Sequence, residues 1–224
     1  MKLRLIVTAA FALLLSLPLA AAAAEGNNFY VGAGIGYSAL DGVSYKPDGG
    51  TRVDVDPDHG AAAAVAFGYR TVTASGPIRA VRFELQHAAS ANGVKSLSSP
   101  GVSGGREVPA DGDIITHALM VNMLFEAPRI GVLTPLLGVG AGWSYYRFDG
   151  VDANGFTQVD DADYAPAAQV LLGLGADLGG GVHLEFFYRA RRQQDVRLKD
   201  DNDRFVDVET GTAHALTGGV GIRF

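Results

Sequence analysis

AHALTGGVGIRF, residues 213–224, ends the chain and alternates between two kinds of side chain. From Leu216 to Phe224 every second residue is apolar or glycine, while the residues between them are small or polar. Successive side chains of a β-strand point to opposite faces, so this alternation predicts a strand with one apolar face. An unpaired strand of this kind invites aggregation, and FYVGAGIGYSA, residues 29–39, has the matching pattern of a partner. Pairing the first strand with the last would close the sheet into a barrel.

Alternating segments of this kind recur between turn-rich stretches, and they number eight. Their first apolar positions are Val31, Ala63, Val81, Leu119, Leu137, Val170, Val182 and Leu216. Each segment has room for the roughly 9–11 residues that a tilted strand needs to cross a bilayer. Long polar connections at 41–59, 90–111, 148–163 and 193–211 alternate with short ones at 71–79, 127–133 and 178–181. The sequence therefore predicts an all-β fold, an eight-stranded antiparallel up-and-down transmembrane β-barrel.

The terminal Phe224 and the alternating apolar residues before it resemble the last strand of bacterial outer-membrane β-barrels. The whole pattern is most similar to the small eight-stranded group of the porin family that includes the OmpA barrel, OmpX and Opa-like proteins. The resemblance implies that Phe224 belongs to an assembly signal read by the barrel-assembly machinery. It also implies that outer-membrane lipid and lipopolysaccharide surround the barrel, with an extracellular ligand as a possible further partner.

The N-terminus has the features of a secretory signal peptide. Lys2 and Arg4 precede an apolar run at 5–17, and Pro18 and a series of alanines follow. We expect cleavage after Ala24, which leaves residues 25–224 as one outer-membrane β-barrel domain. The alternative is a retained transmembrane helix over residues 5–24, which is almost long enough to span a bilayer. The chain has no cysteine, so no disulfide contributes to its stability.

Charge excludes one class of partner and predicts an acidic surface. Without Lys2 and Arg4 the chain has 16 basic and 24 acidic residues, a formal net charge of −8. Nucleic-acid binding needs a basic face, so we expect no nucleic acid as a partner. Of the 24 acidic residues, 18 lie in the four long connections, which predicts a strongly negative outer rim.

Aromatic residues sort into two groups when the strand directions alternate. We expect Phe29, Tyr69, Phe125 and Phe224 near the periplasmic rim and Tyr37, Tyr145, Tyr164 and Tyr188 near the outer rim. Two aromatic girdles are typical of a barrel in a membrane, because amphipathic rings favour the headgroup level. A soluble barrel of the lipocalin kind is the alternative, but it would place large apolar residues inside.

Polar side chains share the predicted inward face with the glycines. They are Arg70, Arg82, Glu84, Gln86, Asn122, Glu126, Gln169, Asp177, Glu185, Arg189 and Arg223. Because buried charges need partners, mixed signs at this density predict a structural network of ion pairs and hydrogen bonds in the lumen. We expect this network to block the barrel. A catalytic or proton-relay group at Arg82, Glu84 and Glu185 is the alternative, but no nucleophile with an adjacent base accompanies it.

Several short motifs suggest nucleotide binding, metal binding or lipid A deacylation, but their residue spacing does not match those sites. The glycine runs at 32–36, 138–142 and 173–175 lack the spacing and the following helix of a nucleotide loop, and they make room for bulkier neighbours instead. His87 and His117 flank one hairpin without a third ligand, and DVDPD at 54–58 lacks the glycine and glutamate of a calcium loop. The His-x-Ser pair of lipid A deacylases is absent, since Ser90 lies one residue too far from His87. We therefore expect no catalytic residue, cofactor site or metal site.

The predicted function is that of a non-enzymatic outer-membrane protein. The resemblance implies a structural or surface-interaction role, adhesion-like, through the acidic extracellular loops. The alternatives are a small porin, or a conduit for small or hydrophobic solutes, and a lipid-modifying enzyme.

Overall fold

A computed structural model describes residues 28–47, 50–73, 76–99, 107–153, 156–199 and 205–224. The signal peptide predicted over residues 1–24 lies outside the described residues. The described strands are β1 (Phe29–Asp41), β2 (Ser44–Pro47), β3 (Val53–Val72), β4 (Ala80–Ser98), β5 (Val108–Glu126), β6 (Leu133–Ala153), β7 (Phe156–Gly179), β8 (Val182–Gln193), β9 (Val196–Lys199), β10 (Phe205–Glu209) and β11 (Thr212–Arg223). No described segment is a helix long and apolar enough to cross a membrane.

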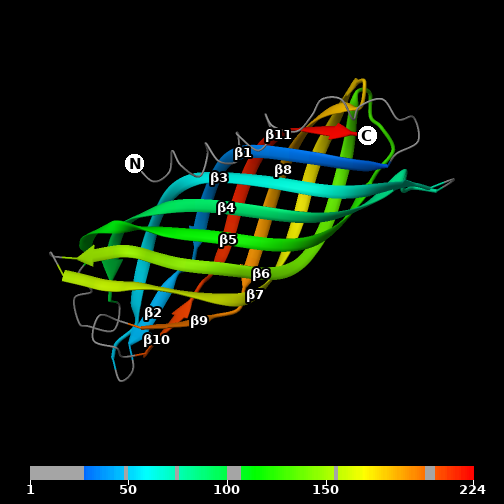
Figure 1. Ribbon diagram of the computed structural model, residues 1–224. Helices are drawn as coiled ribbons and strands as arrows, with labels where there is room; N and C mark the ends of the chain where they lie inside the picture. Colours follow the sequence, from blue (N-terminus) through cyan, green and yellow to red (C-terminus); the bar gives the residue numbers. More distant parts are fainter. Residues whose placement is uncertain (1–27, 48–49, 74–75, 100–106, 154–155, 200–204) are drawn as a thin grey trace.

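Eight of these strands form a closed antiparallel ring. Around the ring the order is β1, β11, β8, β7, β6, β5, β4 and β3, and β3 pairs back with β1. The predicted pairing of the first and last strands is confirmed, with Tyr30 opposite Arg223 and Asp41 opposite Thr212. Phe224 extends this pairing through a bond from its backbone N–H to the carbonyl oxygen of Phe29, at 2.9 Å. Closure leaves the ring without a free edge, as Figure 1 shows.

The outside of the ring is apolar, as the alternation predicts. Leu85 and Leu172 are each 50 % exposed on this outer face, whereas Leu124 and Leu171 are fully buried inside. The aromatic groups also form contacts at opposite ends of the ring. Phe29 packs against Tyr69 with ring centroids 5.0 Å apart, and Tyr145 packs against Tyr164 at 4.9 Å. We call the end with the short turns and Phe224 the turn end, and the opposite end the loop end.

At the loop end the structure differs from the prediction. Strands β3 to β7 have 19 to 24 residues each, so most of 90–111 and of 148–163, both expected to be long loops, continues the ring. Shifts of register, for instance between Asp56 and Gly60 and between Gly93 and Ser96, interrupt the alternation there. Such bulges bend a strand and disturb its period of two, which is why the pattern does not reveal these extensions.

The first and fourth long connections form a small sheet at the loop end. Strand β2 pairs with β3 and with β10, and β10 pairs with β9. We call β2, β9 and β10 the cap; Figure 1 shows the cap at the end of the ring opposite the C-terminus.

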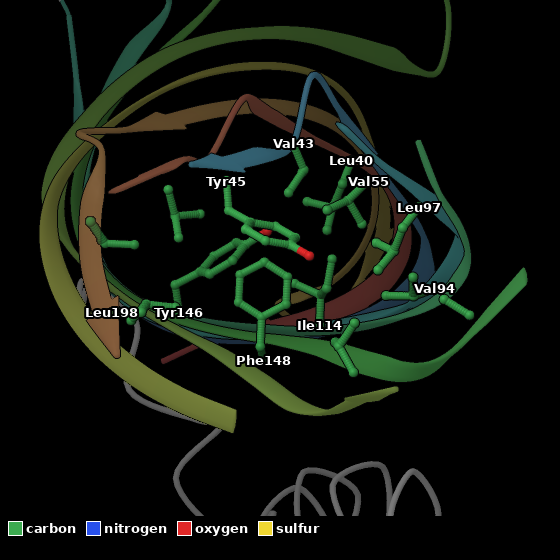
Figure 2. Close-up of a cluster of buried hydrophobic side chains, with 14 of the residues drawn as sticks. Leu40, Val43, Tyr45, Val55, Val94, Leu97, Ile114, Tyr146, Phe148 and Leu198 are labelled. Atoms are coloured by element: carbon green, nitrogen blue, oxygen red, sulfur yellow. The ribbon is translucent and has the colours of Figure 1, made fainter. Parts of the chain in front are cut away.

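Inside the ring, next to the cap, lies a buried apolar cluster. Its members are Leu40, Val43, Tyr45, Val55, Val94, Leu97, Ala110, Ile114, Tyr146, Phe148, Val151, Ala165, Val196, Leu198 and Val208. Figure 2 shows most of these side chains inside the ring, with Tyr45, Tyr146 and Phe148 near its centre. The interior lining of glycines and polar side chains therefore does not extend to this end. Apolar residues in the long connections turn inward here because the cap gives them a surface to pack against.

Candidate functional site in the barrel interior

An ion-pair network fills the lumen near the turn end. The Glu126 carboxylate on β5 accepts hydrogen bonds from Nε and Nη2 of Arg70 on β3, at 2.8 and 2.6 Å. Nε of Arg82 on β4 donates to the same carboxylate at 2.5 Å. These three strands are neighbours in the ring, and all three side chains are at least nine-tenths buried. One carboxylate thus serves two guanidinium groups, an arrangement that needs a second anion nearby.

Glu185 on β8 supplies that anion from the opposite wall. Strands β4 and β8 are separated by three strands on either side of the ring, so the Arg82–Glu185 ion pair crosses the lumen. The Arg82 guanidinium also lies over the Tyr30 ring, 5.2 Å from its centroid. The Tyr30 hydroxyl in turn donates to Glu84 at 2.5 Å. The network therefore joins β1, β3, β4, β5 and β8 into one plug.

A layer of amides lies next to these charges, toward the loop end. The Gln169 amide nitrogen on β7 donates to Asn122 Oδ1 at 2.7 Å and to Gln86 Oε1 at 3.1 Å. Asn122 donates to Glu84 at 3.5 Å, which connects the amides to the charged residues. Beside these amides, Leu124, Leu136, Leu171 and Phe187 on β5 to β8 form a buried apolar patch. Polar and apolar side chains together leave little open space across the lumen.

Glycines make room for these large side chains, as the sequence predicts. A Cβ added at Gly140 would overlap the Asn122 amide, and one at Gly173 would come within 2.5 Å of the Phe187 ring. Gly68 has the same relation to the Tyr30 ring. The glycine runs on β6 and β7 are therefore packing positions.

The structure brings together eight of the eleven predicted lumen residues and separates three. The connected ones are Arg70, Arg82, Glu84, Gln86, Asn122, Glu126, Gln169 and Glu185. Asp177 lies apart, near the β7–β8 turn, where it pairs with Arg129 at 2.9 Å. Arg223 is partly buried beside the plug, and its Nε has no hydrogen-bond partner among the described residues. Arg189 lies farther toward the loop end and donates to the Thr217 hydroxyl.

Tyr30, His183 and Arg191 are interior residues that the sequence prediction missed. Tyr30 completes the plug through Glu84, and the His183 ring packs 6.2 Å from the Tyr30 ring. Arg191 is buried two residues after Arg189, on the same face of β8. All three share the inward phase of their strands, so the alternation alone was a sufficient signal to find them.

Two small cavities lie between the plug and the apolar cluster. One is lined by residues that include Gly32, Gly34, Glu84, Glu185 and Arg189, and the other by residues that include Ser38, Ser90, Arg189 and Arg191. Each has a volume of about 30 Å³, enough for a water molecule or a small ion. Small side chains on β1, β3 and β11 create this space. The lumen is therefore filled at both ends, with these two small cavities between them.

The histidines do not form a metal site in the part of the chain that the structure describes. No group of three or more potential ligands is close enough there to hold a metal ion. His87 and His117 stack on each other with centroids 5.5 Å apart, next to Tyr145 on the lipid-facing side.

At the loop end, acidic residues lie on β3 beside the cap and on β10 of the cap. Arg52 pairs with Asp54 at 2.8 Å and with Glu209 at 2.9 Å, which links β3 to β10. Lys95 pairs with Asp58 at 3.1 Å across β4 and β3. Beneath these surface pairs, burial in the apolar cluster raises the pKa of the Tyr45 phenol. The loop end therefore combines a charged surface with an apolar interior.

Comparison with known proteins agrees with this architecture. Residues 8–224 match the model of a family described as outer membrane protein beta-barrel domain. No curated protein sequence matches the chain. Among solved structures, the outer membrane protein OprG from Pseudomonas aeruginosa is similar at a TM-score of 0.59 and 16 % identity, covering 88 % of this chain and 96 % of OprG. Neisserial surface protein A is similar at 0.51 and 16 %, covering 88 % and 97 %. Outer membrane protein AlkL in lipid bilayers is similar at 0.50 and 19 %, covering 90 % and 93 %.

Proposed function

Because the chain belongs to the outer membrane protein beta-barrel domain family and lies in the bacterial outer membrane, we propose that it is a non-enzymatic surface protein with a blocked lumen. In this proposal the capped and acidic surface at the extracellular loop end binds a ligand outside the cell. The short turns then face the periplasm, as is usual for this architecture.

The observation that carries the proposal is the cap over a filled barrel. A conduit needs a continuous path, but the Arg82–Glu185 pair crosses the lumen at one end and the apolar cluster fills it at the other. A binding surface needs order, because a preorganised surface loses less entropy when it binds. Strand pairing of β2 with β3 and β10 supplies that order to segments that would otherwise be long loops.

Charge suggests the chemistry of the ligand. Asp54, Asp58 and Glu209 lie on the described part of this surface, with Arg52 and Lys95 between them. Most acidic residues of the long connections add to the same rim, which favours a partner with cationic groups. Outer-membrane lipid surrounds the barrel wall, and we propose lipopolysaccharide as its outer-leaflet neighbour.

The experiment is binding of outer-membrane vesicles to host cells and to immobilised matrix proteins. Vesicles with the wild-type chain should bind more than vesicles without it, and shortening 193–211 should remove the difference. A matched variant shortens the periplasmic turn at 127–133, and it should bind like wild type. Heat-modifiable gel migration checks that each variant still folds. Equal binding by the wild-type chain and the shortened 193–211 variant would contradict the proposal.

We also propose that residues 1–24 are removed during export and that residues 25–224 form the mature domain. The charged start, the apolar run and the alanines before Glu25 support this. N-terminal sequencing of protein purified from outer membranes should begin at Glu25. A sequence that begins at Met1 would overturn the proposal.

A further inference from the structure

The charges inside the barrel do not balance. Four buried arginines, Arg70, Arg82, Arg189 and Arg191, share the lumen with the buried Glu84 and Glu126 and the nearly buried Glu185. Glu126 and Glu185 pair with Arg70 and Arg82, and Glu84 accepts from Tyr30. Four arginine charges against three carboxylates leave one positive charge without a counter-charge, and Arg189 and Arg191 carry it on the loop-end side of the plug.

Neither of these two arginines forms an ion pair among the described residues, although Glu84 and Glu185 line a neighbouring cavity together with Arg189. Arg189 donates to the Thr217 hydroxyl and lies over the Phe187 ring at 4.8 Å, but its Nε is buried without a partner. Arg191 is 9 % exposed and makes no hydrogen bond or ion pair in the described part of the chain. A buried guanidinium without a counter-charge is costly, so this arrangement calls for an anion.

Both guanidinium groups border one cavity. Its other polar lining comes from Ser38, Ser90, Gln169, His214 and Thr217, and alanines of β3, β4 and β11 form the remaining walls. No aspartate or glutamate lines it, so an anion there would meet no carboxylate, although Gln169 also carries an amide oxygen without a hydrogen-bond partner among the described residues. The volume of about 30 Å³ limits the occupant to a few atoms.

From this geometry we propose that the cavity at Arg189 and Arg191 binds a small monovalent anion of halide size. Arginine suits the role because its fork of N–H donors stays charged and can contact an anion from two directions. The bound anion supplies the counter-charge that the glutamates of the plug do not provide. The alanine walls matter too, since larger side chains at those positions would fill the site.

Crystals of the refolded full chain, soaked in sodium bromide, test the site directly. An anomalous peak should lie in the cavity, within hydrogen-bonding range of the guanidinium nitrogens of Arg189 and Arg191. A cavity that holds only water after the soak would overturn the proposal. A parallel soak in sodium phosphate should leave the cavity without phosphate, because that anion is too large, and phosphate density there would contradict the assigned size.

Thermal unfolding in detergent tests the same site in solution. At constant ionic strength, replacing sodium gluconate by sodium bromide should raise the midpoint of heat-modifiable migration and reach a plateau, because a ligand that binds only the folded state stabilises it. Arg191→Met should abolish this bromide dependence. Arg192→Met, which changes the exposed neighbouring residue, should retain it.

Folding failure of Arg191→Met would not end the test. Arg191→Lys keeps the charge but loses the fork, so it should fold and reach the bromide plateau at a higher concentration. An Arg191 variant that folds and responds to bromide like wild type would refute the assignment, whatever the crystals show.

Discussion

Glu126 is the residue on which the plug depends most, because it accepts three hydrogen bonds from two arginines. Glu126→Gln would leave Arg70 and Arg82 with too little negative charge in a site that water does not reach. We expect the variant to lose about 3–5 kcal/mol of unfolding free energy, as is usual when one partner of a buried pair is removed. Urea titration of the refolded barrel, followed by heat-modifiable migration, measures the loss.

Asp177→Asn is the control for that substitution. It breaks the Asp177–Arg129 pair, whose side chains are both exposed by more than a third, so the cost should stay below about 1 kcal/mol. Equal losses in the two variants would mean that the buried network does not stabilise the fold more than a surface pair does.

Phe224 is expected to belong to the assembly signal of the barrel. Its substitution should therefore change the amount of assembled protein and not the free energy of unfolding. Phe224→Ser should lower the amount of heat-modifiable protein in outer membranes several-fold. Phe186→Ser, which removes an aromatic ring exposed on the outer face of β8, should have a smaller effect. Similar losses in both variants would show that the terminal ring acts only as one more lipid-facing side chain.

At the scale of elements, the cap depends on Tyr45. This ring is buried in the apolar cluster, while the next residue on β2, Lys46, is exposed. Tyr45→Ala leaves a cavity at a cost of about 3–5 kcal/mol by analogy with other large-to-small core substitutions. We expect proteinase K to cut the Tyr45→Ala variant within 41–59 or 193–211 and to leave the ring intact. The Lys46→Ala variant should resist this cleavage. Resistance of both variants would show that strand pairing alone holds the cap.

The Tyr45 phenol also makes the cap sensitive to alkali. Burial raises its pKa above the ordinary value of about 10, so the folded cap favours the neutral form. The buried neutral phenol therefore contributes fully to the stability of the cap below about pH 10, and this contribution is lost as the pH rises through the raised pKa. Proteolysis of the wild-type cap should therefore increase above about pH 10. Tyr45→Phe should move the increase to higher pH, and an unchanged transition would contradict this account.

The ring could be predicted from the sequence, and the cap could not. Alternation from Val31 to Tyr37 and from Leu216 to Phe224 predicts both strands and their pairing, because one lipid-facing wall imposes one period. Strands β2 and β9 have four residues each, too few to show a period, and the bulge near Pro57 shifts the pattern. Alternation also predicts that Arg82 points into the lumen. It does not predict that Arg82 pairs with Glu185, because that depends on which strands the closed ring places opposite each other.

The whole molecule has two barriers in series along the barrel. One is the plug with its cross-lumen pair Arg82–Glu185, and the other is the apolar cluster beneath the cap. Ions must pass both, so opening either one alone leaves the other to block the path. Wild-type protein in planar bilayers should therefore show no large, stable conductance.

A set of three variants tests this series arrangement. Arg82→Ala with Glu185→Ala removes both charges of the cross-lumen pair, and Tyr45→Ala opens the cap. Each alone should conduct little more than wild type, because the second barrier remains, while the triple variant should conduct at least tenfold more. A large conductance from wild type would contradict the blocked lumen and favour the porin alternative. A large conductance from the cap variant alone would show that the plug is permeable and that the cap is the gate.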